Sequence, residues 1–245
     1  RRLTAVLAQN DIERERFIAL GADPTSCVAA GNLKYAAAPI VVGDSSLRGE
    51  LGLSAGESVV VFGSIHRDEV RGVFAAIDRL PIDDLRIIIA PRHEAAIAAI
   101  GRECRRRAWQ WHRRTAGSLP ANWRILLLDR MGELSRAYAI ASVGVVGGGF
   151  ERHGGHNPLE PIMAGTPVIF GRHFQHFVRE VGALTAATPE AQVRAATELA
   201  ERLTRWLADA SERRRVLALQ RQALPDGAAI AKRYVAALSP WLDGC

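Results

Sequence analysis

Short runs of apolar residues alternate along this chain with longer segments in which apolar positions recur at helical spacing. The apolar runs are continuous rather than alternating with polar residues, which predicts strands buried on both faces. Strands are predicted at residues 3–8, 27–30, 58–63, 85–90, 124–128, 143–146 and 167–170. Helices are predicted at residues 11–20, 68–79, from about 94, 133–140, up to 164 after a glycine-rich loop, and from 189 onward with a break near 225–227; residues 36–56 are predicted to be an irregular linker.

Strands that alternate with helices predict an α/β fold, a parallel sheet with helices on both faces. In such sheets ligands bind at the carboxyl ends of the strands. Polar or glycine-rich clusters follow four of the predicted strands: Ser64 and His66; Pro91 and Arg92; Met131, Gly132 and Glu133; and the glycine-rich loop. Four clusters at one edge of a sheet indicate one shared cleft.

The glycine-rich loop follows the predicted strand at residues 143–146. Six of the chain's 22 glycines, Gly148 among them, lie between Gly144 and Gly155. Glycines allow sharp turns and a close approach of the backbone to another group. A strand, a glycine loop and a helix start together predict an anion-binding site.

The helix start after this loop has two interpretations. Asn157 suits the N-cap, Pro158 the first helical position, and Glu160 the third position of a capping box, in which it returns a hydrogen bond to the cap. Alternatively, Glu160 accepts hydrogen bonds from ribose hydroxyls while nearby amides face a phosphate. Pro161 removes an early backbone donor, which allows the helix boundary to shift by one residue.

Four of the seven histidines form two pairs with the same spacing, His153 with His156 and His173 with His176. Such pairs occur in metal sites. Because neither a cysteine nor a carboxylate pattern completes the set, we favour imidazoles that contact an anion or a sugar, and we expect no metal and no cofactor.

Composition sets limits on the class of protein. The 245 residues, 48% hydrophobic, are enough for one large or two small domains, and the sequence contains no apolar stretch long enough to span a membrane. The start lacks a methionine and a signal peptide, which suggests the interior of a longer protein. Three cysteines without metal spacing indicate a reducing compartment. A net charge of +6 is compatible with phosphate ligands, an anionic membrane or nucleic acid.

Residues 102–114 combine six arginines with Trp109 and Trp111. Arginine and tryptophan together suit an interfacial membrane contact or single-stranded nucleic acid. A solvated helix with an amphipathic tail is at least as consistent with the pattern.

The chain closely resembles the 3-deoxy-D-manno-octulosonic acid (Kdo) transferases of lipopolysaccharide synthesis. The matching segments are Gly31-Asn32-Leu33-Lys34, Gly63-Ser64-Ile65-His66, Pro91-Arg92-His93, Asp129-Arg130-Met131-Gly132-Glu133-Leu134, Gly147-Gly148 through Glu160-Pro161, and Pro167-Val168-Ile169-Phe170-Gly171 with His173 and Phe177. They occur in the family's order across nearly the whole chain. Two positions depart from the family pattern, Arg172 and His176, where the family usually has proline and asparagine.

This resemblance implies a GT-B glycosyltransferase fold and the carboxy-terminal, donor-binding half of an inverting transferase. Residues 1–45 are then the remnant of an acceptor domain plus a linker, and residues 46–245 a Rossmann-like domain with terminal helices that binds CMP-Kdo. Lys34 matches a family lysine that stabilises the transition state. The residues implied to bind CMP-Kdo are Ser64, His66, Pro91, Arg92, Met131, Gly132, Glu133, Gly148, His156, Asn157, Pro158, Leu159 and Glu160.

The resemblance also implies a partner and a location. Kdo would pass from CMP-Kdo to a lipid A precursor at the cytoplasmic face of the inner membrane. The catalytic glutamate and the membrane contact are expected in an amino-terminal half with no counterpart here, so the isolated chain should not transfer Kdo, and no nucleic acid is expected to bind. Two alternatives remain: a GT-B enzyme that uses a UDP-sugar, such as a lipid A disaccharide synthase or an epimerase, and a non-catalytic nucleotide-binding fragment.

Overall fold

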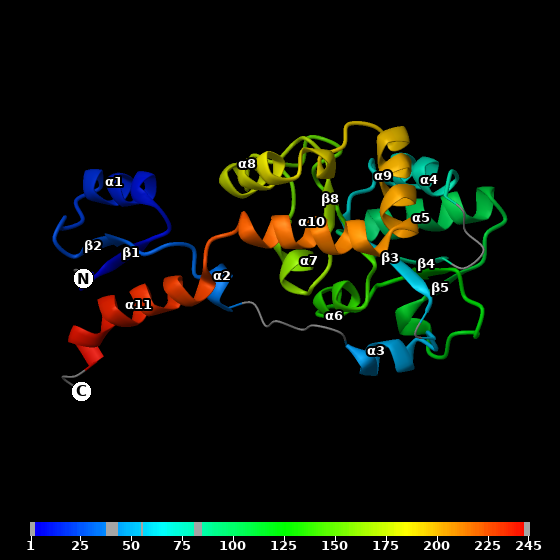
Figure 1. The fold of residues 1–245 in the computed structure, drawn as a ribbon, viewed down its shortest axis with the longest axis horizontal. Coiled ribbons are helices and arrows are strands. Elements are labelled where there is room, and N and C mark those ends of the chain that lie inside the picture. The colour runs from blue at the N-terminus through cyan, green and yellow to red at the C-terminus, as the bar shows by residue number, and fades with distance from the viewer. Residues whose placement is uncertain (1–2, 38–43, 55, 81–84, 243–245) are drawn as a thin grey trace. The chain divides into compact units, whose positions relative to one another are not determined.

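A computed structural model describes residues 3–37, 44–54, 56–80 and 85–242 of the chain. It divides into two compact units, one made of Arg1–Pro39 with Pro225–Cys245 and the other of Ile40–Leu224 (Figure 1). The sequence placed the boundary near residue 45 and the terminal helices with the larger domain. In the structure the last helix belongs instead to the smaller unit, because it packs on residues near the start of the chain.

The smaller unit is built from both ends of the sequence. Strands β1 (Val6–Ala8) and β2 (Cys27–Ala29) are parallel, and helices α1 (Asp11–Ala19), α2 (Lys34–Ala37) and α11 (Gly227–Leu242) complete the unit. Two side chains of α11 fix this arrangement: Arg233 donates to the carbonyl of Ala30 and Tyr234 to that of Gly31, each at 2.9 Å.

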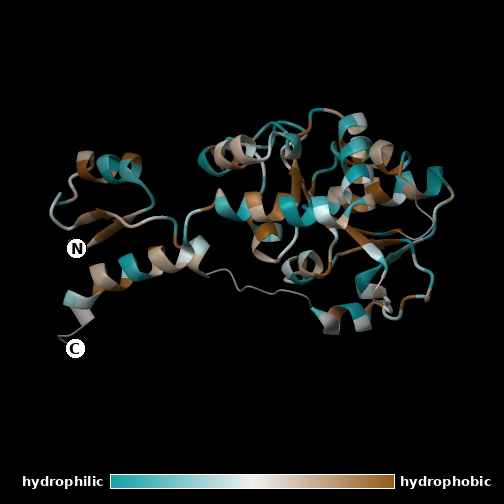
Figure 2. Ribbon diagram, viewed as in Figure 1, coloured by the Kyte–Doolittle hydropathy of each residue, from teal (hydrophilic) through white to brown (hydrophobic). Residues whose placement is uncertain are grey.

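The larger unit contains a six-stranded sheet in the order β5-β6-β4-β3-β7-β8, with every pairing parallel. Its strands are β3 (Ser58–Ile65), β4 (Leu85–Pro91), β5 (Trp111–Arg113), β6 (Ile125–Leu127), β7 (Val143–Val146) and β8 (Val168–Phe170). The strands are mostly hydrophobic in Figure 2, and residues 59–62 and 87–89 are fully buried. The predicted parallel sheet with continuously apolar strands is confirmed.

Helices cover both faces of this sheet (Figure 1). Helix α4 packs against α5 and α9, whereas α7 packs against α6 and α10. The helices of this unit are α3 (Ser45–Glu50), α4 (Val70–Ile77), α5 (Glu94–Arg106), α6 (Leu134–Ala139), α7 (Leu159–Met163), α8 (Val178–Ala187), α9 (Ala196–Ala208) and α10 (Ala210–Gln222), with 3-10 turns at Arg114–Ala116 and Pro189–Ala191. Across the described ranges, no helix has the length and apolarity that a membrane span requires.

Three elements differ from the sequence prediction. Helix α3 lies within the stretch predicted to be irregular; Asp44 caps it by accepting from the Leu47 amide at 2.9 Å. Helix α8 precedes residue 189, where continuous helix was predicted to begin. Strand β5 occupies part of the arginine-rich segment.

The tryptophans of that segment are structural. Trp109 stacks on Phe74 with ring centroids 5.9 Å apart, and the guanidinium groups of Arg107 and Arg124 lie over the Trp109 ring at 5.3 and 4.9 Å. Trp111 also packs against the core. Packing inside this unit therefore accounts for an arginine and tryptophan pattern that had also suggested a membrane or nucleic-acid surface.

Candidate functional site

The candidate site lies at the carboxyl edge of the large sheet, where β3, β4 and β7 end. The β3 strand has a bulge just before its end, with the pairing register shifting between Phe62 and Ile65. Within the bulge Ser64 has a φ of 57°, a left-handed conformation that is uncommon outside glycine. Such conformations cluster where surrounding structure holds them, often at functional sites. Ser64 thus reaches the predicted edge in a strained turn that directs the chain toward His66.

Backbone hydrogen bonds fasten the three strand ends together at this bulge. The amide of Gly147, after β7, donates to the carbonyl of Gly63 at 2.9 Å. The amide of Arg92, after β4, donates to the carbonyl of Ile65 at 2.9 Å. The predicted residues at these exits therefore stand on adjacent, rigidly paired strands.

The glycine loop folds back on itself in positive-φ conformations, with φ values of 76° at Gly148, 83° at Gly154 and 76° at Gly155. The amide of Gly155 donates to the carbonyl of Gly148 at 2.8 Å, which closes the loop. A Cβ added at Gly148 would lie 2.8 Å from Cδ2 of His156. The loop's glycines are therefore required by close packing, Gly148 against an imidazole of the candidate site.

The carboxylate of Glu69, which the sequence did not single out, sits inside this loop. It accepts hydrogen bonds from the amides of Gly148 at 2.8 Å, Phe150 at 3.0 Å and His66 at 3.0 Å, with a longer contact of 3.4 Å from Glu151. Glu69 is 3% exposed, and burial raises its carboxyl pKa above the usual value although the amide bonds oppose this.

Glu69 changes the interpretation of the loop as an anion site. The amides of Gly148 and Phe150 already have an anionic partner from the protein itself. The sequence offered only a weak signal, an acidic residue directly before a helix that follows a buried strand. The polar groups of the loop that remain available to a ligand are instead its histidine side chains.

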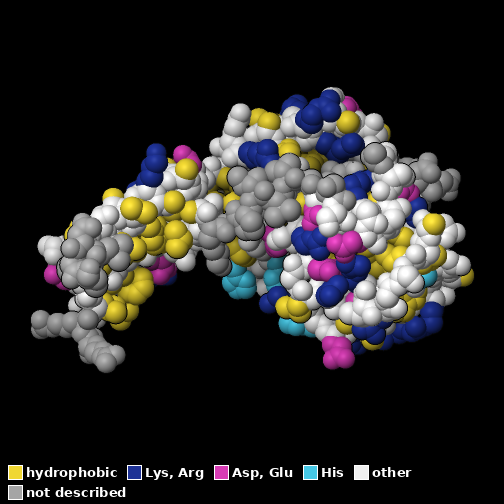
Figure 3. All heavy atoms as spheres, turned by 90° about the horizontal axis from the view of Figure 1, so that it is seen from below, with side chains coloured by type: hydrophobic (Ala, Val, Ile, Leu, Met, Phe, Trp, Pro, Cys, Tyr) yellow, Lys and Arg dark blue, Asp and Glu magenta, His cyan; other side chains and the backbone are white. Residues whose placement is uncertain are grey.

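Four imidazoles gather next to the loop. Nε2 of His66 lies 2.7 Å from Nε2 of His156, and the ring of His66 stacks on that of His153 with centroids 3.9 Å apart. The His93 ring meets His66 edge-on at 5.5 Å. Nε2 of His153 lies 2.8 Å from a carboxylate oxygen of Asp68. Histidine side chains reach the surface of this unit beside arginine side chains in Figure 3.

The two imidazoles that face each other are held in the neutral form. Burial, with smaller effects from Arg92 and the neighbouring histidines, lowers the pKa of His156 to about 4. Burial, followed by His153, also lowers the pKa of His66. Arg92 is fixed to the same strand end by its backbone, since its amide donates to the carbonyl of Ile65, the residue before His66.

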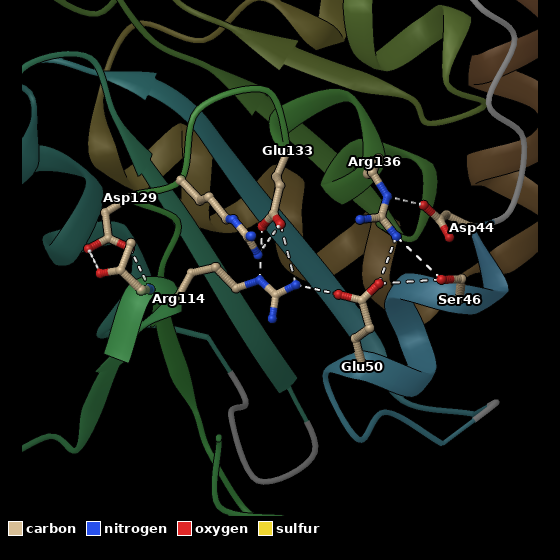
Figure 4. Close-up of polar contacts among 9 residues, drawn as sticks. Asp44, Ser46, Glu50, Arg114, Asp129, Glu133 and Arg136 are labelled. Atoms are coloured by element: carbon tan, nitrogen blue, oxygen red, sulfur yellow. Dashed lines mark hydrogen bonds and ion pairs between the residues drawn. The ribbon is translucent and has the colours of Figure 1, made fainter. Parts of the chain in front are cut away.

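The third predicted cluster, residues 131–133, belongs to a chain of ion pairs (Figure 4). Glu133 is 7% exposed and accepts from Nε of Arg114 at 2.9 Å and from Arg130 at 3.3 Å. Arg114 also pairs with Glu50, which in turn pairs with Arg136 at 2.9 Å. The Glu133 carboxylate is therefore oriented from outside its own loop.

The rest of this loop is open. The Met131 side chain is 97% exposed, and Gly132 has a φ of 84°, which lets the chain turn toward Glu133. An exposed methionine beside an oriented carboxylate can cover the flat face of a base or sugar ring.

The fourth predicted cluster differs in detail from a capping box. Helix α7 begins at Leu159 with Pro158 as N-cap, one residue later than predicted, and Oδ1 of Asn157 accepts from the Leu159 amide at 3.1 Å. Oε1 of Glu160 accepts from the Ser135 hydroxyl at 2.6 Å instead of returning a bond to the cap. The reciprocal capping interpretation is wrong, because α7 begins one residue later than predicted and the Glu160 carboxylate is bonded to Ser135.

The second predicted histidine pair makes other contacts. His173 accepts from Nε of Arg172 at 3.1 Å, and His176 packs against Gly154. Groups of three or more His, Cys, Asp or Glu residues arranged to hold a metal ion do not occur among the described residues. Lys34 starts α2 in the smaller unit, and its side chain lies outside the described part of the structure.

The described cysteines, Cys27 and Cys104, are free and buried. Burial raises the pKa of the Cys104 thiol to about 12, so it is unreactive at neutral pH. Neither contributes chemistry to the strand edge. Cys245 lies outside the described residues.

Comparisons with known proteins find relatives along almost the whole chain. The chain is 31% identical to the 3-deoxy-D-manno-octulosonic acid transferase of Bordetella pertussis and 27% identical to that of Haemophilus influenzae. Each alignment covers 98% of this chain, but only 57% and 58% of the two relatives, so the chain spans little more than half their length. No family model matches the chain.

Solved structures lead to the same group of proteins. The C-terminal CMP-Kdo binding domain of WaaA from Acinetobacter baumannii matches with a TM-score of 0.66 and 26% identity, over 74% of this chain and 96% of that domain. A glycosyltransferase from Rickettsia africae, 10% identical with a TM-score of 0.55, shares the fold alone.

The parallel sheet and its strand-edge site define a GT-B glycosyltransferase domain of the Rossmann-like type, as predicted. Among proteins of that class, the matches in sequence and in structure converge on a single group. The chain belongs to the Kdo transferase family.

Proposed function

We propose that this chain binds CMP-Kdo and serves as the donor-binding part of a transferase that delivers Kdo to a lipid A precursor. The observation that carries the proposal is the convergence of Arg92, His66 and His156 at the carboxyl edge of a sheet matched by a CMP-Kdo binding domain. This edge is where doubly wound sheets bind nucleotides.

The side chains at this edge suit the parts of the ligand. Arg92 presents a guanidinium, which recognises phosphate oxygens bidentately. Glu133 and Glu160 supply carboxylate acceptors for ribose or base donors, the first oriented by Arg114 and the second by Ser135. Asn157 and the loop at Met131 and Gly132 would enclose the nucleoside, with Pro91, Pro158 and Leu159 shaping the walls.

The transfer step requires charge stabilisation at the donor phosphate. An acceptor hydroxyl attacks the anomeric carbon, the bond from that carbon to the phosphate oxygen breaks, and CMP leaves with inversion at the carbon. The phosphate gains negative charge as the bond breaks, and we assign stabilisation of that charge to the Arg92 guanidinium. The family resemblance implies transition-state stabilisation by Lys34 and deprotonation of the acceptor by an amino-terminal glutamate, and we assign these roles accordingly.

The nature of the acceptor indicates where in the cell the reaction takes place. A lipid A precursor is held in a bilayer, so we propose that the complete transferase works as a peripheral protein at the cytoplasmic face of the inner membrane. We assign the described residues to the donor side of this reaction. The isolated chain is therefore expected to bind nucleotide without transferring sugar.

Calorimetry with CMP, UDP and cytidine tests the proposal. CMP should bind, cytidine should bind more weakly because it lacks the phosphate, and UDP should bind most weakly. Replacing Arg92 with alanine should weaken CMP binding by about 10- to 100-fold, the value of a charge-assisted hydrogen bond. The matched control is Arg71→Ala, an exposed arginine on α4. Preference for UDP over CMP, or equal CMP affinity in the Arg92 and Arg71 variants, would overturn the proposal that this chain binds CMP-Kdo.

A further inference from the structure

The histidine cluster has a geometry that the nucleotide-binding proposal alone does not require. With 2.7 Å between Nε2 of His66 and Nε2 of His156, one ring donates its N–H to the unprotonated nitrogen of the other. The stacked ring of His153 and the edge of His93 close two further sides of His66. A third oxyanion-bonding group, Arg92, acts electrostatically on both members of the pair.

The charges around the pair are unevenly distributed. Asp68 is bonded to His153, and the Glu69 carboxylate is turned into the glycine loop, where backbone amides satisfy it. The β4 exit carries Arg92 and His93 and the loop carries His153, and each of the three lowers the pKa of both imidazoles. The pair therefore lies among cationic or ionisable groups, and the nearest anions are already engaged.

This distribution of charges favours the binding of an anion. An oxyanion placed between the pair and Arg92 would accept from the guanidinium and from an imidazolium. It would also offset the repulsion that keeps the imidazoles neutral. The donor carries two candidate oxyanions, the phosphate and the carboxylate of the sugar acid.

We propose that the His66–His156 pair is a subsite for an oxyanion of the donor and that it takes up a proton from solvent when the anion binds. The proposal rests on the proposed function, since it names the groups that hold the donor's charge. His153 is a positioning residue: Asp68 holds its ring nitrogen, and its ring face supports His66.

Linkage gives the sign of the pH dependence. In the free protein the pKa of His156 is lowered to about 4, so the pair is neutral at pH 7. A bound anion raises that pKa, and the complex then holds a proton that the free protein lacks. Affinity for the anion should therefore rise as pH falls, by up to about tenfold per pH unit for uptake of one proton.

Calorimetry of the whole chain with CMP, in two buffers of different ionisation enthalpy, measures this proton directly. The phosphate of CMP itself titrates near pH 6, so the decisive quantity is the difference between wild type and His156→Gln with the same ligand. Glutamine retains hydrogen bonding but does not titrate. The matched control is His112→Gln, a half-buried histidine on the edge strand β5.

We expect proton uptake in wild type and His112→Gln between about pH 5 and pH 8, the range in which imidazoles titrate. His156→Gln and His66→Gln should lose it while still binding CMP at the upper end of this range. Free Kdo and cytidine identify the anion: uptake with CMP but not cytidine assigns the phosphate, and uptake with Kdo assigns the sugar carboxylate.

The outcomes separate this proposal from the previous one. CMP binding without proton uptake, or uptake that persists in both histidine variants, overturns the subsite and leaves the CMP-binding proposal standing. Absence of CMP binding overturns both. If a variant fails to fold, NMR titration of the histidine ring protons in wild type decides, because the pKa of the pair must rise when CMP or Kdo is added.

Discussion

The carboxylate of Glu69 and the amide of Gly148 are 2.8 Å apart across 79 positions of sequence. This bond joins the start of helix α4 to the turn of the glycine loop, and the amide of Phe150 strengthens it. The buried side chain of Glu69 thus holds the backbone of the loop that carries the histidines. Order in the loop therefore depends on a residue that faces away from the ligand edge.

Replacing Glu69 with glutamine should destabilise the protein and weaken CMP binding together. A glutamine offers one acceptor and directs its own NH₂ group at backbone donors, which leaves buried amides without partners at about 1 to 3 kcal/mol each. Urea unfolding and CMP calorimetry measure the two effects. Glu151→Gln, an exposed carboxylate on the same loop, is the control. An unfolding midpoint equal to that of the control would contradict this role of Glu69.

A methyl group at Gly148 should disturb the same loop from its other side. Gly148 combines a φ of 76° with a Cβ position 2.8 Å from the His156 ring. Alanine should cost about 1 to 2 kcal/mol for the left-handed backbone alone and reduce CMP affinity by displacing His156.

Gly182 on α8 is the matched control for Gly148, because a Cβ there meets no atom within 4 Å. Gly182→Ala should stabilise the protein by about 0.5 to 1 kcal/mol through helix propensity. Chemical denaturation of both variants tests the contrast. Equal changes in stability at the two glycines would contradict the packing described for the loop.

The neutral state of His156 predicts a loss of stability in acid. Its pKa is lowered to about 4 in the folded protein, against about 6.5 in an unfolded chain. Between these values the unfolded chain binds a proton that the folded protein does not, so stability falls as pH falls through this window. The contribution of His156 is at most about 3 kcal/mol.

His156→Gln should remove that contribution. We expect the free energy of unfolding of the variant to decline less than that of wild type between about pH 6.5 and pH 4. Urea titrations at several pH values give the comparison, and His112→Gln serves again as the control. Parallel pH profiles for His156→Gln and wild type would argue against a depressed pKa at this residue.

The ion-pair chain around Glu133 predicts a residue-specific effect of Arg114. Lysine keeps the charge but cannot bridge two carboxylates with a planar fork. Arg114→Lys should break the link that Arg114 makes between Glu133 and Glu50, and it should lower CMP affinity by up to about tenfold. Circular dichroism should show little change in overall fold. Arg71→Lys provides the control. Unchanged CMP affinity in Arg114→Lys would exclude Glu133 as an oriented contact.

Much of the fold could be predicted because the strands of the large sheet are continuously apolar and buried on both faces. Strands β3, β4 and β7 were found within two residues of their observed ends. Helix α3 was missed because it is only six residues long, and its signal is a capping contact from Asp44. Strand β5 was missed because it pairs along a single edge and its residues are largely polar.

The site was predicted less completely than the fold. His66, Arg92 and His156 could be placed together because parallel strands end at one edge. Glu69 could not, since its role depends on a loop that begins 78 residues later and returns over it. The partners of Glu160 and Glu133 also come from other elements, Ser135 and Arg114, and local spacing contains no information about them.

The composition of the smaller unit from both ends of the sequence bears on the order in which the protein is made. All residues of the larger unit are synthesised before α11, so that unit can fold during translation. Strands β1 and β2 are made before the larger unit, yet they must wait for Arg233 and Tyr234 before the carbonyls of Ala30 and Gly31 gain their partners. Strands that are synthesised before the larger unit are therefore completed after it.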